Sequence, residues 1–153
     1  MTLVLAFLIG FFGGLRSLTA PALVAWAAWA GWIRLDGELS LVGSPISVGL
    51  FTVLAIAEIV ADKLPTTPSR TAPPGLIARI VLGCLTGACI ATAGGHGVIV
   101  GAVLGAVGGL VGCFGGYLAR TGLVHALGTK DLPVALAEDA LAIFGSLWVV
   151  LRF

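Results

Sequence analysis

The sequence predicts an all-α integral membrane protein, a single domain over residues 1–153 with a bundle of about five transmembrane helices. Hydrophobic residues make up 59% of the chain and charged residues only 10%, with a mean hydropathy of +1.14. Soluble domains hold about 25% charged residues. The apolar stretches are also long, and one helix needs about 20 such residues to cross a bilayer. The lipid bilayer is therefore the first expected partner.

Charge and cysteine content disfavour several classes of function. The net charge of +1 provides neither a basic field for nucleic acid nor a polybasic lipid-binding tract. The three cysteines lie in apolar or glycine-rich stretches and form no Cys-x-x-Cys pair, so we interpret them as small buried thiols. The chain also lacks Gly-x-Ser-x-Gly, His-Glu-x-x-His and phosphate-loop motifs. An enzyme is thus the less favoured class, and no cofactor is expected.

The first predicted span, residues 2–32, is longer than one straight helix needs. Gly13, Gly14 and Pro21 surround Arg16, and this pattern predicts a kinked or broken helix. Two interpretations stay open. The arginine of a kinked helix pairs with a carboxylate, or a discontinuous helix presents backbone groups to a ligand, as in many transporters.

Four further spans are expected after the first, separated by loops rich in turn-forming or charged residues. The second ends just before Pro65, and Pro133 opens the last. The predicted helices cover residues 46–64, 76–93, 98–118 and 133–153.

The fourth of the five expected spans carries a dense glycine pattern with a period of four residues. Small residues at this spacing let helix backbones approach closely in a membrane, although each glycine costs about 1 kcal/mol relative to alanine in water. We predict a packing face like a glycine zipper, rather than a pore lining. It lies against other helices or against a second copy in a homo-oligomer. Its residues are Gly101, Gly105, Gly108 and Gly112.

Two pairs of similar segments suggest a weak inverted repeat, an arrangement that builds many transporters. Residues 12–17 resemble residues 114–121, and residues 54–58 resemble residues 134–138. In a bundle of five spans the two copies have opposite orientations. Glu58 and Glu138 nevertheless come out at the same depth, which lets them meet.

Basic residues gather on one side of the five-span bundle and predict its orientation. Lys63, Arg70, Arg79, Arg120 and Lys130 lie in or beside two loops of one side. The other side holds only Arg34 and Arg152. By the positive-inside rule, the N-terminus is expected in the cytoplasm and the C-terminus outside.

Ionisable residues at the ends of the predicted helices are the candidate functional residues, because charge is costly in hydrocarbon. Glu58 and Asp62 lie four residues apart and share one helix face. The candidate ion- or substrate-binding residues are Glu58, Asp62, Glu138 and Asp139, and their charge partners are Arg16, Lys63, Arg79 and Arg120.

These residues also carry a family resemblance. The segment Glu-Ile-Val-Ala-Asp-Lys-Leu-Pro at residues 58–65, Gly14-Leu-Arg16, Arg79 and residues 136–140 resemble the bacterial family called domain of unknown function 4126. The resemblance covers nearly the whole chain and implies a multi-pass protein of the bacterial inner membrane, without an established activity. The chain departs from the family pattern in the loop at residues 66–74, where proline and threonine replace an acidic segment.

Three functions follow as hypotheses. In the first, the acidic cluster at the cytoplasmic side serves a transporter or channel for protons or a small cation, which carboxylate oxygens bind well. In the second, the charges pair only with one another in a structural or assembly protein. In the third, Arg16, Lys63 and Arg79 bind lipid phosphate head groups.

Overall fold

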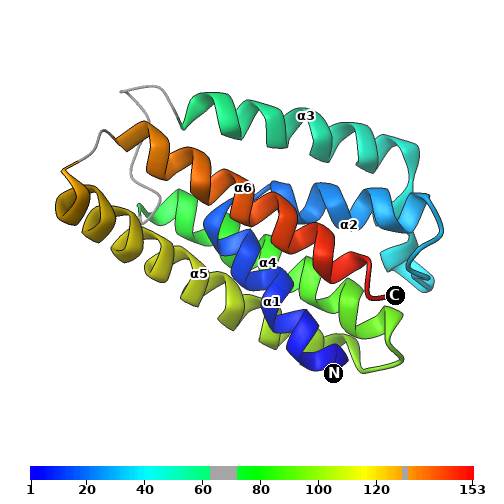
Figure 1. Ribbon diagram of the computed structural model, residues 1–153. Helices are drawn as coiled ribbons and strands as arrows, with labels where there is room; N and C mark the ends of the chain where they lie inside the picture. The colour runs from blue at the N-terminus through cyan, green and yellow to red at the C-terminus, as the bar shows by residue number, and fades with distance from the viewer. Residues whose placement is uncertain (63–71, 129–130) are drawn as a thin grey trace.

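The computed structural model describes residues 1–62, 72–128 and 131–153, and these residues form an all-helical bundle (Figure 1). Its elements in chain order are α1 (Thr2–Leu15), α2 (Thr19–Trp29), the 3₁₀ helix η1 (Gly37–Gly43), α3 (Pro45–Ala61), α4 (Pro73–Ala93), α5 (Val98–Leu127) and α6 (Asp131–Val150). Among the described residues, α4, α5 and α6 are long and apolar enough to span a membrane, and the bent pair of η1 and α3 adds a fourth candidate. The predicted count of five spans is therefore not confirmed.

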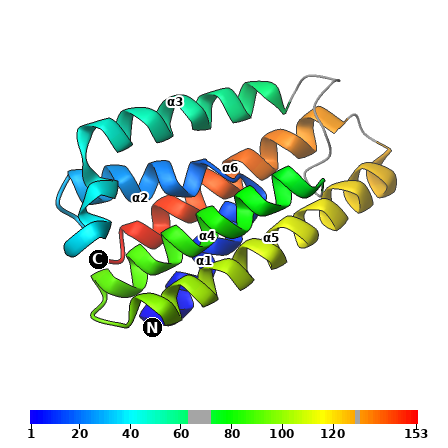
Figure 2. The ribbon, with the colours of Figure 1, turned by 180° about the vertical axis from the view of Figure 1, so that it is seen from behind.

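The first expected span is a hairpin of two short helices. The helix breaks after Leu15, where Arg16 is extended with φ −136° and ψ 111°, and α2 begins only at Thr19. The two helices run in opposite directions (Figures 1 and 2). At 1.5 Å per residue they are about 21 and 16 Å long, shorter than the roughly 30 Å of a hydrocarbon core. The predicted break at Arg16 is confirmed, but residues 2–32 do not form one span.

This reversal puts both termini at one end of the bundle, which we call the terminal end (Figures 1 and 2). The last turns of α3 and α5 and the first turns of α4 and α6 lie at the other end, the loop end. A single first span would have put the termini at opposite ends. Which side of the membrane each terminus occupies stays a prediction.

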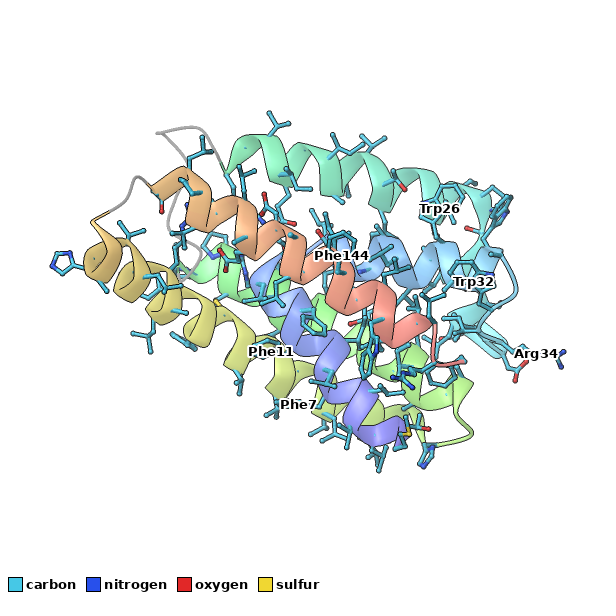
Figure 3. The ribbon with its side chains drawn as sticks, viewed as in Figure 1. Phe7, Phe11, Trp26, Trp32, Arg34 and Phe144 are labelled. Atoms are coloured by element: carbon cyan, nitrogen blue, oxygen red, sulfur yellow. The ribbon has the colours of Figure 1, made fainter. Side chains whose placement is uncertain are left out.

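The glycines of α5 lie where this helix passes its neighbours. A Cβ atom at Gly101 or Gly105 would overlap the α4 backbone at Gly87 or Gly83. At Gly108 and Gly112 it would overlap the carbonyl oxygens of two α1 residues, Phe7 and Phe11. Figure 3 shows Phe7 and Phe11 on the side of α1 that faces α5. The two glycine pairs thus face two different helices, and whether the bundle needs them for folding stays a prediction.

The end of α5 differs from the expectation. Residues 119–127 continue the helix, although a loop was predicted from residue 119. This segment contains no proline, and its one glycine does not break it. The helix ends at Gly128, whose φ of +56° is the left-handed conformation that glycine adopts at a helix C-terminus. As a result Arg120 lies on a helix that faces α6.

The outermost helix is α3, which packs against α2 and η1 (Figure 1). Its buried side chains are Val48 and Ala55. A hydrogen bond of 3.0 Å from Trp26 Nε1 to Thr52 Oγ1 joins it to α2. Its outer face exposes large apolar side chains, as expected for a helix in contact with lipid.

The proposed repeat pairs segments of different structure. Residues 12–17 cross the break after α1, whereas residues 114–121 lie inside the continuous helix α5. Residues 54–58 lie in the last turns of α3, and residues 134–138 in the first turns of α6. The sequence similarity therefore does not correspond to an inverted structural repeat at these positions.

Candidate functional site: a charged hairpin tip

The tip of the α1–α2 hairpin, residues 16–18, is the centre of a buried network of charges. The side chain of Arg16 is 0% exposed. Its Nε donates to Asp139 Oδ1 at 2.5 Å, and its Nη1 forms an ion pair with Asp62 Oδ2. A single guanidinium therefore joins the hairpin to the end of α3 and to the middle of α6.

Glu58 binds the two residues that directly precede α2, Ser17 and the N-cap residue Leu18. Its Oε1 accepts hydrogen bonds from the backbone N–H of Ser17 at 2.9 Å and from Ser17 Oγ at 2.5 Å. Its Oε2 accepts from the N–H of Leu18 at 2.9 Å. The first N–H groups of a helix lack intrahelical partners and carry a partial positive charge, so a carboxylate satisfies both needs. This carboxylate comes from a residue 41 positions away in the sequence.

Arg79 binds the other side of the break, at the C-terminal end of α1. Its Nε donates to the carbonyl oxygen of Gly14 at 3.0 Å, one of the last carbonyls of α1. Its Nη1 donates to Gly75 O in its own helix at 2.9 Å, and its Nη2 lies 3.9 Å from Glu58 Oε1. A cation at the C-terminus of a helix balances the negative end of the helix dipole. On each side of the break, a side chain thus carries the charge opposite to that of the helix end it binds.

These groups lie well inside the bundle. Asp139 is about 12 Å along α6 from its first residue, and Arg79 is about 9 Å along α4, at 1.5 Å per residue. Arg16, Arg79 and Asp139 are all buried. Ionised side chains at such a depth are costly and usually mark ion pathways or relays in membrane proteins.

A second charged cluster lies between α5 and α6. Arg120 donates from Nε to Asp131 Oδ1 at 2.8 Å, and its Nη2 forms an ion pair with Asp131 Oδ2. Its Nη1 lies 3.6 Å from Glu138 Oε2. Arg120 and Glu138 also line a cavity between the two helices, which we call the α5–α6 cavity.

The structure divides the eight charged candidates into groups. It brings Glu58, Asp62, Asp139, Arg16 and Arg79 together at the hairpin tip, and places Glu138 beside Arg120. Lys63 lies outside the described residues. Among residues 1–62, 72–128 and 131–153, no group of three or more His, Cys, Asp or Glu side chains could hold a metal ion.

Sequence reasoning missed the partners contributed by the hairpin backbone and by one exposed acid. Ser17 and Leu18 donate to Glu58, Gly14 accepts from Arg79, and Asp131 pairs with Arg120. The glycines and Pro21 around Arg16 were the available signal, because a broken helix must find partners for its free N–H and C=O groups. Asp131 gave no such signal, since it was assigned to a loop.

A broken hairpin that carries charge into a bundle of membrane-length apolar helices defines a multi-pass helical membrane protein. The chain belongs to the family described as domain of unknown function 4126, whose model matches residues 3–151. The match confirms the family resemblance of residues 58–65 and the other segments named in the sequence analysis. No curated protein and no solved structure matches the chain.

Proposed function

We propose that this protein is a transporter or channel for protons or a small cation, and that the hairpin tip is its exchange site. The observation that supports the proposal is the break between α1 and α2, which lies inside a bundle of membrane-length helices. Its two free ends are capped by Arg79 and Glu58, both ionisable side chains. Broken helices whose ends meet charged groups near mid-membrane are the common architecture of ion-coupled transporters.

Glu58 is the proposed proton-accepting group. When one carboxyl oxygen takes up a proton, Glu58 loses the negative charge that attracts the positive end of α2. The link between α3 and the hairpin tip weakens as a result. Among the described elements, α3 makes its main contacts with α2 and η1. Weakening of the link between Glu58 and the hairpin tip therefore favours movement of α3. Proton uptake and movement of the outer helix are therefore coupled.

Asp62 and Asp139 are the proposed cation-binding pair. The guanidinium of Arg16 lies between their carboxylates, which is where a small hard cation would bind oxygen ligands. A cation that enters must displace Arg16 from this position. Competition between Arg16 and the transported ion for the same two acids prevents both from being bound at once.

We propose that the protein lies in the bacterial inner membrane with the loop end in the cytoplasm. Arg120 lies near this end. Three further basic residues fall in the sequence segments 63–71 and 129–130, outside the described residues: Lys63, Arg70 and Lys130. The terminal end has Arg34, which projects from the bundle (Figure 3), and Arg152. The positive-inside rule then puts both termini outside. The N-terminus changes side relative to the sequence-based expectation, because α1 and α2 form a hairpin.

A structural or assembly role is the second candidate, and one observation favours it. Each of the four candidate acids has an arginine or a helix end as a partner. Such a network stabilises a bundle without moving an ion, as intramembrane charges commonly do. This function predicts no flux and a stable complex with itself or with another membrane protein.

Ion flux into liposomes separates these two functions. The purified protein is reconstituted into vesicles that contain a pH-sensitive dye or a divalent-cation dye, and a pH or ion gradient is applied. The proposal predicts dye signals faster than in protein-free vesicles. Equal signals for all ions tested, with the protein folded and inserted, would contradict transport and favour the structural role.

A further inference from the structure

The α5–α6 cavity has a volume of about 180 Å³. Its lining is mostly apolar, with Leu15 from the hairpin and two charged residues. The residues that line it are Leu15, Gly116, Ala119, Arg120, Leu123, Val134, Ala137, Glu138 and Leu141. An apolar cavity of about 150 Å³ in a soluble protein stays dry and binds benzene. The α5–α6 cavity is thus large enough for a hydrocarbon segment, and its walls do not favour water.

The mouth of this cavity lies between two helices of membrane-spanning length. Leu141 of α6 lines the cavity and is about half exposed. In a bilayer, an exposed leucine on such a helix contacts acyl chains. A lipid tail therefore reaches the cavity without crossing water.

The charged part of the cavity lies near the surface of the bilayer. Arg120 is about 33 Å along α5 from Val98 at 1.5 Å per residue, close to the thickness of a hydrocarbon core. Asp131, the first residue of α6, is 60% exposed on its side chain. An acyl chain in the cavity therefore has its head group beside Arg120 and Asp131.

The charges at this position match a head group that carries both signs. The distance of 3.6 Å from Arg120 Nη1 to Glu138 Oε2 is longer than a hydrogen bond, so Nη1 can donate to a phosphate oxygen. The carboxylate of Asp131 already binds Arg120 through both oxygens, but its exposed side can accept a further hydrogen bond from an ammonium group. Glu138 adds a second negative charge next to the same cation. A phosphate alone would meet one arginine and two carboxylates.

We propose that the α5–α6 cavity binds one acyl chain of a phospholipid with a primary ammonium head group. The phosphate accepts from Arg120 and the ammonium donates to Asp131. This site is separate from the hairpin tip and does not depend on transport. The lipid-phosphate hypothesis from the sequence assigned this role to Arg16, Lys63 and Arg79. Arg16 and Arg79 are buried and bonded at the tip, and Lys63 lies outside the described residues.

Native mass spectrometry of the detergent-solubilised protein tests the proposal. Dioleoyl phosphatidylethanolamine and dioleoyl phosphatidylglycerol are titrated separately, because they share acyl chains and only the first has an ammonium group. We expect one molecule of phosphatidylethanolamine to be retained per chain, and about tenfold weaker retention of phosphatidylglycerol. Equal retention of the two lipids would overturn the assigned head group.

Two pairs of variants locate the bound lipid. Ala137→Phe fills the cavity and should abolish retention, whereas Leu136→Phe adds an aromatic ring to a neighbouring exposed position outside the lining and should retain the lipid. Arg120→Gln should weaken retention about tenfold, and Arg34→Gln should not change it. Full retention by Ala137→Phe would overturn the site, and this comparison stands even if Arg120→Gln does not fold.

Discussion

Arg79 and Glu58 bind the chain on either side of the break between α1 and α2, with 3.9 Å between Arg79 Nη2 and Glu58 Oε1. Arg79 donates to the last turn of α1 through Gly14 O, and Glu58 accepts from the N-cap residue of α2 through Leu18 N. The cation meets the negative end of one helix dipole and the anion the positive end of the other. The break is therefore stabilised at both sides by residues from α4 and α3.

Replacing Arg79 should destabilise the hairpin. In Arg79→Gln the shorter neutral side chain leaves Gly14 O without its charged donor inside the bundle, and we expect a loss of about 1 to 3 kcal/mol in the free energy of unfolding. Denaturant unfolding in detergent measures it. Arg34→Gln removes the same charge from an exposed position and serves as the control. Equal stability of the two variants would show that Arg79 does not support the break.

Arg16 should be coupled energetically to both of its acids. Removing the guanidinium in Arg16→Gln leaves two carboxylates near each other inside the bundle, and breaking a buried ion pair costs about 3 to 5 kcal/mol. Adding Asp62→Asn and Asp139→Asn should restore much of the stability. A double-mutant cycle measures the coupling. Losses that simply add would contradict a shared network.

Bulk at the α5 glycines should prevent close packing of the helices. Gly105→Leu meets the α4 backbone and Gly112→Leu meets the α1 backbone, so the yield of folded protein in detergent should fall for both. Gly115→Leu is the matched control, because a Cβ atom there meets no atom within 4 Å. Equal yields for all three variants would show that the bundle does not depend on these contacts.

Reporter fusions should place both termini on one side of the membrane. A reporter that is active only in the cytoplasm should work after Ser69, which lies outside the described residues, and fail when fused to Met1 or after Phe153. The reason is that the hairpin returns the chain to the terminal end before α3 begins. A reporter active at Met1 and inactive after Phe153 would instead support a single first span.

The sequence predicted the helical class, the membrane environment, the break near Arg16 and the start of α5 at Val98. Composition and glycine spacing are local signals, so they can be read without tertiary contacts. The direction of the chain after Arg16 is not local. It depends on partners 41 to 123 positions away, Glu58 and Asp139 among them, which hold the reversed hairpin in place. The sequence-based orientation of the N-terminus therefore assumed a single first span, which residues 2–32 do not form.

The site was predictable in its residue types and not in its pairing. Buried charge next to apolar runs identified Glu58, Asp62 and Asp139 together with Arg16 and Arg79. The predicted depths of Glu58 and Glu138 in the membrane suggested that the two side chains meet. In the structure, Glu58 binds the N-cap residue of α2, and Glu138 lies beside Arg120. The α5–α6 cavity had no sequence signal, because it depends on the continuation of α5 beyond residue 118.

Proton flux through the Glu58→Gln variant tests the central claim most directly. Glutamine keeps one acceptor oxygen, for Ser17, loses the acceptor for Leu18 and removes the titrating carboxylate. The variant should still fold, insert into liposomes and lose the proton flux of the parent protein. Glu38→Gln makes the same change on exposed η1 and should keep the flux. If Glu58→Gln fails to accumulate and a second change of Arg79 to Gln restores its stability, the charges serve only as a structural ion pair. Unchanged flux in a folded Glu58→Gln protein would equally contradict Glu58 as the exchange group.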